Sequence, residues 1–436
     1  MSPNIAVVVL DTLRRDTFSE HFDWLPGVSF ERAYSTSHWT IPSHASLFTG
    51  VYPSESGVHA KSLDMDYPGE TLAEAFRRNG YTTRFYTANG NLSFWDGWDR
   101  GFDEFVPRAQ LSPAHEQLVD WTAFSRESDH SGPSKLAAAV KQCVTADCPT
   151  IPALRQGYQY WRRPSSDGGT RDIVDRVAQT DFGNRELVVI NLMETHVPYH
   201  APDGGAPVHV DTGDAFADSV ANPDHIRSAY GTSASYLATW YRKLYRLLDE
   251  DFEYIVTLSD HGEMLGEHGH WNHGYGLYPE LVRVPLVLSG PTADRTVTDT
   301  TTPVNLLDLH RTIAELAEVS VDSRGRSLCA EVDDRPLLTE YHGFVPWHRE
   351  MFDRKGVPES TYEMCDAERR GVVTEDGYTY ETHADGLQCP SDRTEIEADR
   401  TTLQTLVESL DVRSVTADDA SIDDEVREQL EQLGYA

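Results

Sequence analysis

Short apolar runs that alternate with helix-like segments constrain the fold of this chain more than any other feature. Ile5–Leu10 is apolar throughout, as a strand buried on both faces of a parallel sheet should be. Further strand-like runs follow along the chain, at Tyr81–Thr87, Leu187–Leu192, Phe252–Leu258 and Pro285–Ser289. Helical spacing precedes two of them, over Leu72–Asn79 and Tyr236–Leu248. The pattern predicts an α/β fold with a central, mostly parallel sheet flanked by helices.

Two changes in this rhythm suggest the domain organisation. Residues 107–180 are polar with scattered Trp and Tyr, and we interpret them as an insertion that forms a lid over the site. Towards the C-terminus, Gly371–Thr382 predicts an antiparallel hairpin and Asp423–Leu433 an acidic amphipathic helix. We therefore expect a catalytic domain over residues 1–325 and a small C-terminal α+β domain over residues 326–436.

The charge of the chain limits its partners. With 37 basic and 71 acidic residues, the net charge is −34, which repels nucleic acid and anionic lipid surfaces. Only five of the basic residues are Lys, and the rest are Arg. Acid-rich, Lys-poor surfaces are typical of proteins that work in molar salt, where the Debye length falls to about 3 Å. We interpret the chain as halophilic, with an ordinary acidic enzyme as the alternative.

The sequence also indicates where the protein works. It contains no apolar run of about 18 residues that would span a membrane. The short segment before Ile5 lacks the basic start of a signal peptide. The five cysteines are scattered without metal-binding spacing, so we expect them to be reduced. We expect a cytoplasmic protein without a membrane span, and the oligomeric state stays open.

Side chains that bind metals or anions follow four of the predicted strands. In open parallel sheets, sites form beyond the carboxyl ends of the strands. The residues in question are Asp11, Asn89, Asn91, Glu194, Thr195, His196, Asp260 and His261. Asp11, Asp260 and His261 offer the oxygen and nitrogen donors that suit Mn²⁺, Zn²⁺, Ca²⁺ or Mg²⁺. The pattern predicts one divalent metal ion with an anion beside it, although a lone Asp11 can also be a helix N-cap.

The stretch from His38 to Gly50 predicts a helix with a reactive hydroxyl at its start. Pro42 is well placed to open this helix and Gly50 to end it. Thr40 then lies just before an N-terminus, where free N–H groups and the helix dipole favour an anion. A hydroxyl there that also binds a metal can ionise and act as a nucleophile. The alternative role for Thr40 is a plain N-cap.

Taken together, several motifs in order resemble the sulfatase branch of the alkaline phosphatase superfamily. They are Val9–Arg14, Thr40–His44, Leu47–Pro53, Gly80–Thr83, Gly101–Asp103, His196–Tyr199, Ser259–Gly269, Arg283–Leu286 and Gly325–Leu328. The resemblance covers most of residues 3–330. It implies an alkaline-phosphatase-like fold and a metal-dependent enzyme that hydrolyses a small anionic ester.

The resemblance also implies roles for single residues. Asp11, Asp260 and His261 match metal ligands, and Thr40 matches a nucleophile that also touches the metal. His196 matches a histidine that binds the anionic group. His273 falls where the family usually has a Lys near the leaving group, and it can act as general acid with an unperturbed pKa of about 6.5. The implied substrate-binding residues are Asn89, Asn91 and His44.

Departures from the family pattern bear on the reaction. A sulfatase has Cys or Ser at position 40, which is oxidised to formylglycine, and Thr40 cannot give that aldehyde. Three family cations are replaced, by His44, Asn89 and His273. A Thr nucleophile is similar to the superfamily's phosphodiesterases and phosphotransferases, and fewer positive charges suit a singly charged ester.

We therefore expect phosphodiester or related phosphoester cleavage through Thr40. The alternatives are a sulfatase, a phospho-group transferase, and a non-catalytic relative that binds anions or glycans.

Overall fold

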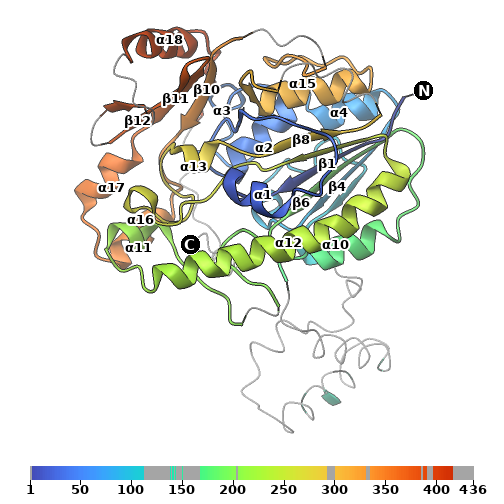
Figure 1. Ribbon diagram of the computed structural model, residues 1–436, viewed down its shortest axis with the longest axis horizontal. Coiled ribbons are helices and arrows are strands. Elements are labelled where there is room, and N and C mark those ends of the chain that lie inside the picture. The colour runs from blue at the N-terminus through green and yellow to red at the C-terminus, as the bar shows by residue number, and fades with distance from the viewer. Residues whose placement is uncertain are drawn as a thin grey trace.

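The computed structural model confirms the α/β architecture, with a large central sheet, helices around it and a small second sheet beside it (Figure 1). It describes the chain in seven ranges and five single positions. These are residues 2–111, 167–202, 205–291, 300–329, 334–383, 386–389 and 396–415, with residues 138, 140, 141, 143 and 150.

The central sheet is mostly parallel, as predicted. Its described strands are β1 (Ile5–Leu10), β2 (Val28–Ser29), β4 (Thr82–Thr87), β5 (Glu104–Val106), β6 (Glu186–Leu192), β7 (Tyr254–Leu258) and β8 (Leu286–Ser289). They lie in the order β2-β8-β7-β1-β6-β4-β5. The strands from β7 to β5 run parallel, whereas β8 is antiparallel to both β7 and β2. Strand β1 pairs on both sides and is buried along its whole length, which explains its unbroken apolar sequence.

Helices cover both faces of this sheet. On one face lie α2 (Thr40–Thr49), α4 (Leu72–Arg78) and α15 (Leu306–Leu316). On the other lie α1 (Arg15–His21), α10 (Thr170–Val177) and α12 (Pro223–Asp251). Successive side chains of a strand point to opposite faces, so Ile5, Val7 and Val9 pack with the first layer. Ala6, Val8 and Leu10 pack with the second.

The later part of the chain forms the small second sheet. Its antiparallel strands are β10 (Leu337–Tyr341), β11 (Arg369–Thr374), β12 (Gly377–Thr382) and β13 (Gly386–Gln388). The flanking helices are α16 (His348–Arg354), α17 (Glu359–Asp366) and α18 (Glu397–Glu408). The predicted hairpin is confirmed, because Thr374 pairs with Gly377 across its turn. The Glu340 N–H donates to the Thr36 carbonyl at 2.8 Å, which ties β10 to the segment before α2.

Short elements complete the described fold. They are β3 (Ala33–Tyr34), β9 (Val304–Asn305), α3 (Pro53–Ser56), α5 (Asn91–Phe94), α6 (Arg108–Leu111), α11 (Thr212–Phe216), α13 (Pro279–Val282) and a 3₁₀ turn at Glu267–Gly269. Among the described helices, none is long and apolar enough to cross a membrane.

Two predicted segments lie wholly or mainly outside the described residues. These are the acidic helix at Asp423–Leu433 and most of the insertion at residues 107–180. The described end of that insertion, α10, contributes Ile173 and Val177 to the core under the sheet. This end therefore belongs to the helical layer.

Candidate active site

Polar side chains meet at one edge of the central sheet. Asp11 follows β1, Asn89 follows β4 and Asp260 follows β7. These strands are parallel, so their carboxyl ends lie at the same edge. The Asp11 N–H also donates to the Leu192 carbonyl at the end of β6, at 2.9 Å. The structure thus brings these residues together, as their places in the sequence predict.

Asp11, Asp260 and His261 form a buried cluster that suits a metal ion. One donor atom from each lies within 4.8 Å of the others. The Oδ2 atom of Asp260 is buried and accepts no hydrogen bond from any described residue. Within the described part of the chain, no Lys or Arg forms an ion pair or a hydrogen bond with either carboxylate. Two buried carboxylates without a Lys or Arg partner favour a divalent metal, and this donor set admits Mn²⁺, Zn²⁺, Ca²⁺ or Mg²⁺.

Hydrogen bonds hold the two carboxylates in place. Thr12 donates from its hydroxyl to Oδ1 of Asp11 at 2.7 Å and from its N–H to Oδ1 of Asp260 at 3.3 Å. Its φ of 63° lies in the left-handed region, which is uncommon for a β-branched residue, and such strained residues cluster at active sites. Burial alone would raise the pKa of Asp260, but the His261 and His44 imidazoles and the Thr12 N–H lower it. Asp260 is therefore ionised and available as a ligand.

Thr40 lies beside this cluster as the first residue of α2. The helix begins two residues earlier than Pro42 predicts, so Thr40 is inside its first turn and Trp39 is the N-cap. The Thr40 hydroxyl is 3.2 Å from Nε2 of His261, and the Asn89 amide donates to it at 3.3 Å. The same Asn89 amide donates to Oδ2 of Asp11 at 2.8 Å. One side chain thus couples the hydroxyl to the carboxylate cluster at a helix N-terminus.

The other two predicted substrate-binding residues lie near Thr40. His44 is one turn further along α2, with Nδ1 at 3.0 Å from the Thr40 carbonyl and 3.4 Å from Oδ2 of Asp260. Asn91 begins α5, and its N–H donates to Oδ1 of Asn89 at 2.9 Å. The side-chain amide of Asn91 is buried without a hydrogen-bond partner among the described residues. Such a group is a candidate contact for a substrate oxygen.

His196 and His273 complete the site. The His273 ring centroid is 4.6 Å from that of His261 and 4.7 Å from that of His196. Nδ1 of His273 is 3.2 Å from Oε1 of Glu263, and Oε2 of Glu263 accepts from the Tyr199 hydroxyl at 2.9 Å. Burial lowers the pKa of His196 to about 4 and that of His273 to about 3. Burial raises the pKa of Glu263 to about 7, so the Glu263–His273 pair can store a proton.

Asn191 is a residue of the site that escaped the sequence prediction. The Asn191 amide donates to Oδ2 of Asp11 at 2.9 Å, the same oxygen that accepts from Asn89. It lies inside β6, in a run that is otherwise apolar from Leu187 to Leu192. A single amide within a buried strand is the signal that identifies it, because a buried polar group needs a partner.

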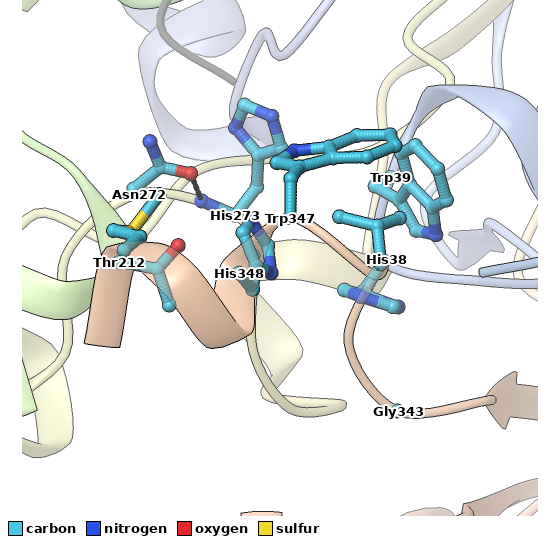
Figure 2. Close-up of a pocket in the computed structure, with 11 residues that line it drawn as sticks. His38, Trp39, Thr212, Asn272, His273, Gly343, Trp347 and His348 are labelled. Carbon is cyan, nitrogen blue, oxygen red and sulfur yellow. Dashed lines mark hydrogen bonds between the residues drawn. The ribbon is translucent and has the colours of Figure 1, made fainter. Parts of the chain in front are cut away.

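A narrow pocket opens beside His273 (Figure 2). It is lined by His38, Trp39, Thr212, Asn272, His273, Gly274, Gly343, Val345, Trp347, His348 and Met351. Trp39 directly precedes Thr40, while Trp347 and His348 come from the later part of the chain. The segment between β10 and α16 therefore closes one side of the site.

A carboxylate–imidazole cluster that could hold a metal ion lies beside a helix N-terminus, at the carboxyl edge of a mostly parallel sheet, and this arrangement fits an ester hydrolase that uses a metal ion. The chain belongs to the sulfatase family, whose model matches residues 3–319. The resemblance inferred from the motifs is thereby confirmed.

Individual proteins of known sequence or structure are also similar to this chain. A choline-sulfatase of Rhizobium meliloti is 24% identical over 451 residues, which cover 91% of this chain and 85% of the relative. The low-salt glycan biosynthesis sulfotransferase Agl7 of Haloferax volcanii is 32% identical over 300 residues, which cover 66% of this chain and 54% of that protein. The chain thus matches about half the length of Agl7. A phosphonate monoester hydrolase from Silicibacter pomeroyi shares the fold, with a TM-score of 0.62 at 18% identity over 97% and 98% of the two chains.

Proposed function

We propose that this enzyme cleaves a singly charged anionic ester, in the first place a phosphodiester or related phosphoester, with Thr40 as the nucleophile. The observation that carries the proposal is the placement of the Thr40 hydroxyl. It lies at the N-terminus of α2, next to His261 and within hydrogen-bond distance of the Asn89 amide that also holds Asp11. Thr40 cannot form the aldehyde of a formylglycine enzyme, so a direct alkoxide attack is the chemistry open to it.

The residues present can carry out a two-step reaction. A divalent metal held by Asp11, Asp260 and His261, with Thr40 as a further ligand, would lower the pKa of a bound hydroxyl and stabilise charge on the substrate oxygens. The Thr40 oxygen attacks phosphorus, its bond to phosphorus forms, and the bond to the leaving alcohol breaks. Free N–H groups of α2 and the Asn89 amide stabilise the negative charge on the substrate. Water then attacks phosphorus: its bond to phosphorus forms, the bond to Thr40 breaks with Thr40 leaving as the alkoxide, and a proton of the water returns through His273 to Glu263, which supplied the proton of the first step.

The leaving oxygen needs a proton, and His273 is placed to deliver it. Because burial lowers the pKa of His273 to about 3, its ring is neutral at pH 7 and cannot act as a cationic acid on its own. We infer that His273 passes a proton to the leaving group while Nδ1 takes one from Glu263. The raised pKa of Glu263 keeps part of the enzyme in the required protonation state near neutral pH.

The charge of the site favours a diester over a monoester. No Lys or Arg of the described chain contacts Thr40 or the three proposed metal ligands. A doubly charged phosphomonoester would meet two carboxylates with only one metal ion to offset its charge. A phosphodiester and a sulfate ester each carry a single negative charge, so both suit this site better.

Sulfate chemistry is the second candidate. The family model and the choline-sulfatase favour sulfate ester hydrolysis. The sulfotransferase Agl7 favours transfer of the group from Thr40 to an alcohol in place of water. Both reactions use the same nucleophile and differ in the transferred group or in the acceptor.

The test compares three chromogenic esters in molar KCl with Mn²⁺ or Zn²⁺. The substrates are bis-p-nitrophenyl phosphate, p-nitrophenyl phosphate and p-nitrophenyl sulfate, each with wild type, Thr40→Ala and Thr40→Ser. We expect the diester to be turned over fastest, Thr40→Ala to lose about 10³-fold or more, and Thr40→Ser to retain measurable activity. Bound metal, measured by elemental analysis, shows whether Thr40→Ala keeps its site. Near-native rates in Thr40→Ala contradict the proposal, and faster turnover of the sulfate ester favours the second candidate.

We further propose that the enzyme works in concentrated salt. The support is the net charge of −34 together with the near absence of Lys.

A further inference from the structure

The turn that follows β1 holds Thr12 in a left-handed backbone conformation. Its φ of 63° is uncommon for a β-branched residue, so the surrounding contacts must hold this backbone in place. In this conformation the Thr12 N–H donates to Oδ1 of Asp260 at 3.3 Å, and the hydroxyl donates to Oδ1 of Asp11 at 2.7 Å. A turn of the Thr12 backbone to the ordinary extended region would point its N–H elsewhere. The contact with Asp260 therefore depends on the left-handed conformation.

A tyrosine from a distant helix closes this turn. The Tyr230 hydroxyl donates to the Thr12 carbonyl at 2.9 Å and accepts from the Arg14 N–H, also at 2.9 Å. Tyr230 belongs to α12, which packs with α1 against the same face of the sheet (Figure 1). One hydroxyl group thus bridges the two ends of the Thr12–Arg14 segment, although Tyr230 and Thr12 are 218 residues apart.

The position of the Tyr230 hydroxyl is fixed by packing. The side chain is 1% exposed, and its ring packs edge-on against that of Tyr199, with ring centroids 5.4 Å apart and an angle of 88° between the planes. Within the part of the chain that the structure describes, no other group donates to the Thr12 carbonyl. The Leu13 N–H donates to the Ser259 hydroxyl at 3.0 Å, but this bond holds the next residue of the turn.

We propose that Tyr230 is a positioning residue for the metal centre. Its hydroxyl keeps Thr12 in the left-handed conformation, and Thr12 in turn holds the carboxylates of Asp11 and Asp260 in the arrangement that binds the ion. The inference rests on the metal-dependent cleavage proposed above, and it adds the residue that fixes the ligands before the ion binds. Contacts behind the ligands of a metal typically change its affinity by about 10-fold to 100-fold.

The test measures metal affinity, because this quantity does not depend on turnover. Metal-free wild type, Tyr230→Phe and Tyr241→Phe are titrated with Zn²⁺ against a chromogenic chelator at one KCl concentration. Tyr230→Phe keeps the packed ring and removes only the hydroxyl. We expect it to bind Zn²⁺ about tenfold more weakly, because Thr12 is then free to leave the left-handed conformation. An affinity equal to that of wild type would overturn the inference.

Tyr241→Phe is the matched control on the same helix. Tyr241 is fully buried, and its hydroxyl forms a hydrogen bond with the Thr257 hydroxyl of β7. The loss of this bond should lower the free energy of unfolding, measured with urea, and leave the Zn²⁺ affinity unchanged. Equal losses of affinity in the two Phe variants would show a general effect of buried hydroxyl groups on α12 and would overturn the inference.

A second substitution tests whether Tyr230 acts through Thr12. Asn adopts the left-handed conformation several times more readily than most residues, so a Thr12→Asn chain needs the Tyr230 hydroxyl less. We expect Tyr230→Phe to weaken Zn²⁺ binding less in the Thr12→Asn background than in wild type. An equal loss in the two backgrounds would show that Tyr230 acts by another route and would overturn the inference.

Failure of the proposed function gives a different result. If wild type binds Zn²⁺ and turns over none of the three esters, the proposed cleavage is contradicted, while the affinities still decide the role of Tyr230. If turnover is found, Tyr230→Phe should need more Zn²⁺ for half its maximal rate, and saturating Zn²⁺ should restore most of kcat. Asp260→Asn alters a proposed ligand and identifies the Zn²⁺ bound at this site. If that variant binds as much Zn²⁺ as wild type, the inference is overturned.

Discussion

At the scale of single residues, the main result is the set of side chains in contact with the Thr40 hydroxyl. Pro42 and Gly50, which mark the two ends of a helix in the sequence, predict that Thr40 lies at the start of this helix. The structure adds the contacts of Thr40 with His261 and Asn89. The sequence could not show that Asn89 also holds Asp11, because the two lie 78 residues apart. Such a contact arises only from the parallel packing of β1, β6 and β4.

The role of Glu263 can be tested through the leaving group. In Glu263→Gln the side-chain amide can still donate a hydrogen bond to Nδ1 of His273, but it has no acidic proton to transfer. We expect kcat for an ester of a poor leaving group, such as a methyl ester, to fall by about 10²-fold or more. The rate with p-nitrophenol as leaving group should change little, because that oxygen needs no proton. The measurement is a plot of log kcat against leaving-group pKa for both proteins.

Tyr199, which contacts the second carboxylate oxygen of Glu263, provides a matched control. Tyr199→Phe removes the hydroxyl that donates to Oε2 of Glu263 and leaves the proton store in place. This variant should keep a leaving-group dependence close to that of wild type. If Glu263→Gln slows all esters equally, Glu263 has a structural role and the proton transfer proposed here is wrong.

At the scale of elements, the apolar central strands were predicted closely, whereas the short or edge strands β2, β5, β10 and β13 and some helices were not. Apolar runs identified β1, β6, β7 and β8 to within two residues at each end, because strands buried on both faces leave little room for polar side chains. Helix α12 is longer than its predicted core at Tyr236–Leu248. Its first part carries few apolar residues, and only the packing of Ile226 and Tyr230 reveals it as helix.

The contact between His59, in the loop after α3, and His342, just after β10, should make stability depend on pH. His59 and His342 stack with ring centroids 4.1 Å apart and lie close to Arg370 and Lys61. Burial, followed by these cations, lowers the pKa of His59 to about 4. The folded state therefore binds fewer protons than the unfolded state between pH 6.5 and 4, and stability falls as the pH is lowered through this range.

We expect this histidine pair to account for a measurable part of the acid sensitivity. At pH 5, His59 alone should cost about 2 kcal/mol relative to pH 7. His59→Gln cannot be protonated, so its free energy of unfolding should fall less between pH 7 and pH 5 than that of wild type. Urea unfolding at the two pH values measures both differences. An identical pH dependence in the two proteins would show that His59 is free to titrate in the folded state.

At the scale of the whole molecule, the architecture bears on the fold and the site, and the acidic composition bears on the response to salt. The mostly parallel sheet, the two helical layers and the small antiparallel sheet agree with the fold class predicted from the alternation of apolar runs. The closing of the pocket by Trp347 and His348 was not predictable. These residues reach the site because β10 is tied to the segment before α2, a contact between distant parts of the chain.

The acidic composition predicts a response to salt. Repulsion among the excess carboxylates opposes the compact state and weakens as salt screens it. We expect the unfolding temperature to rise steadily between about 0.2 M and about 3 M KCl. Differential scanning fluorimetry at constant pH measures it, with NaCl as a check on ion identity. An unfolding temperature that does not change over this range would place the chain with ordinary acidic enzymes.

The most direct test of the account is to trap the covalent intermediate on Thr40. Wild type and Thr40→Ser are mixed with bis-p-nitrophenyl phosphate or p-nitrophenyl sulfate, quenched in acid within the first turnover, digested and examined by high-resolution mass spectrometry. The account predicts that the peptide containing Thr40 gains one p-nitrophenylphosphoryl group from the diester or one sulfuryl group from the sulfate ester, and that Thr40→Ala, treated in the same way, never does. Turnover by wild type with no modified Thr40 peptide at any quench time, or with the group on another residue, would contradict it.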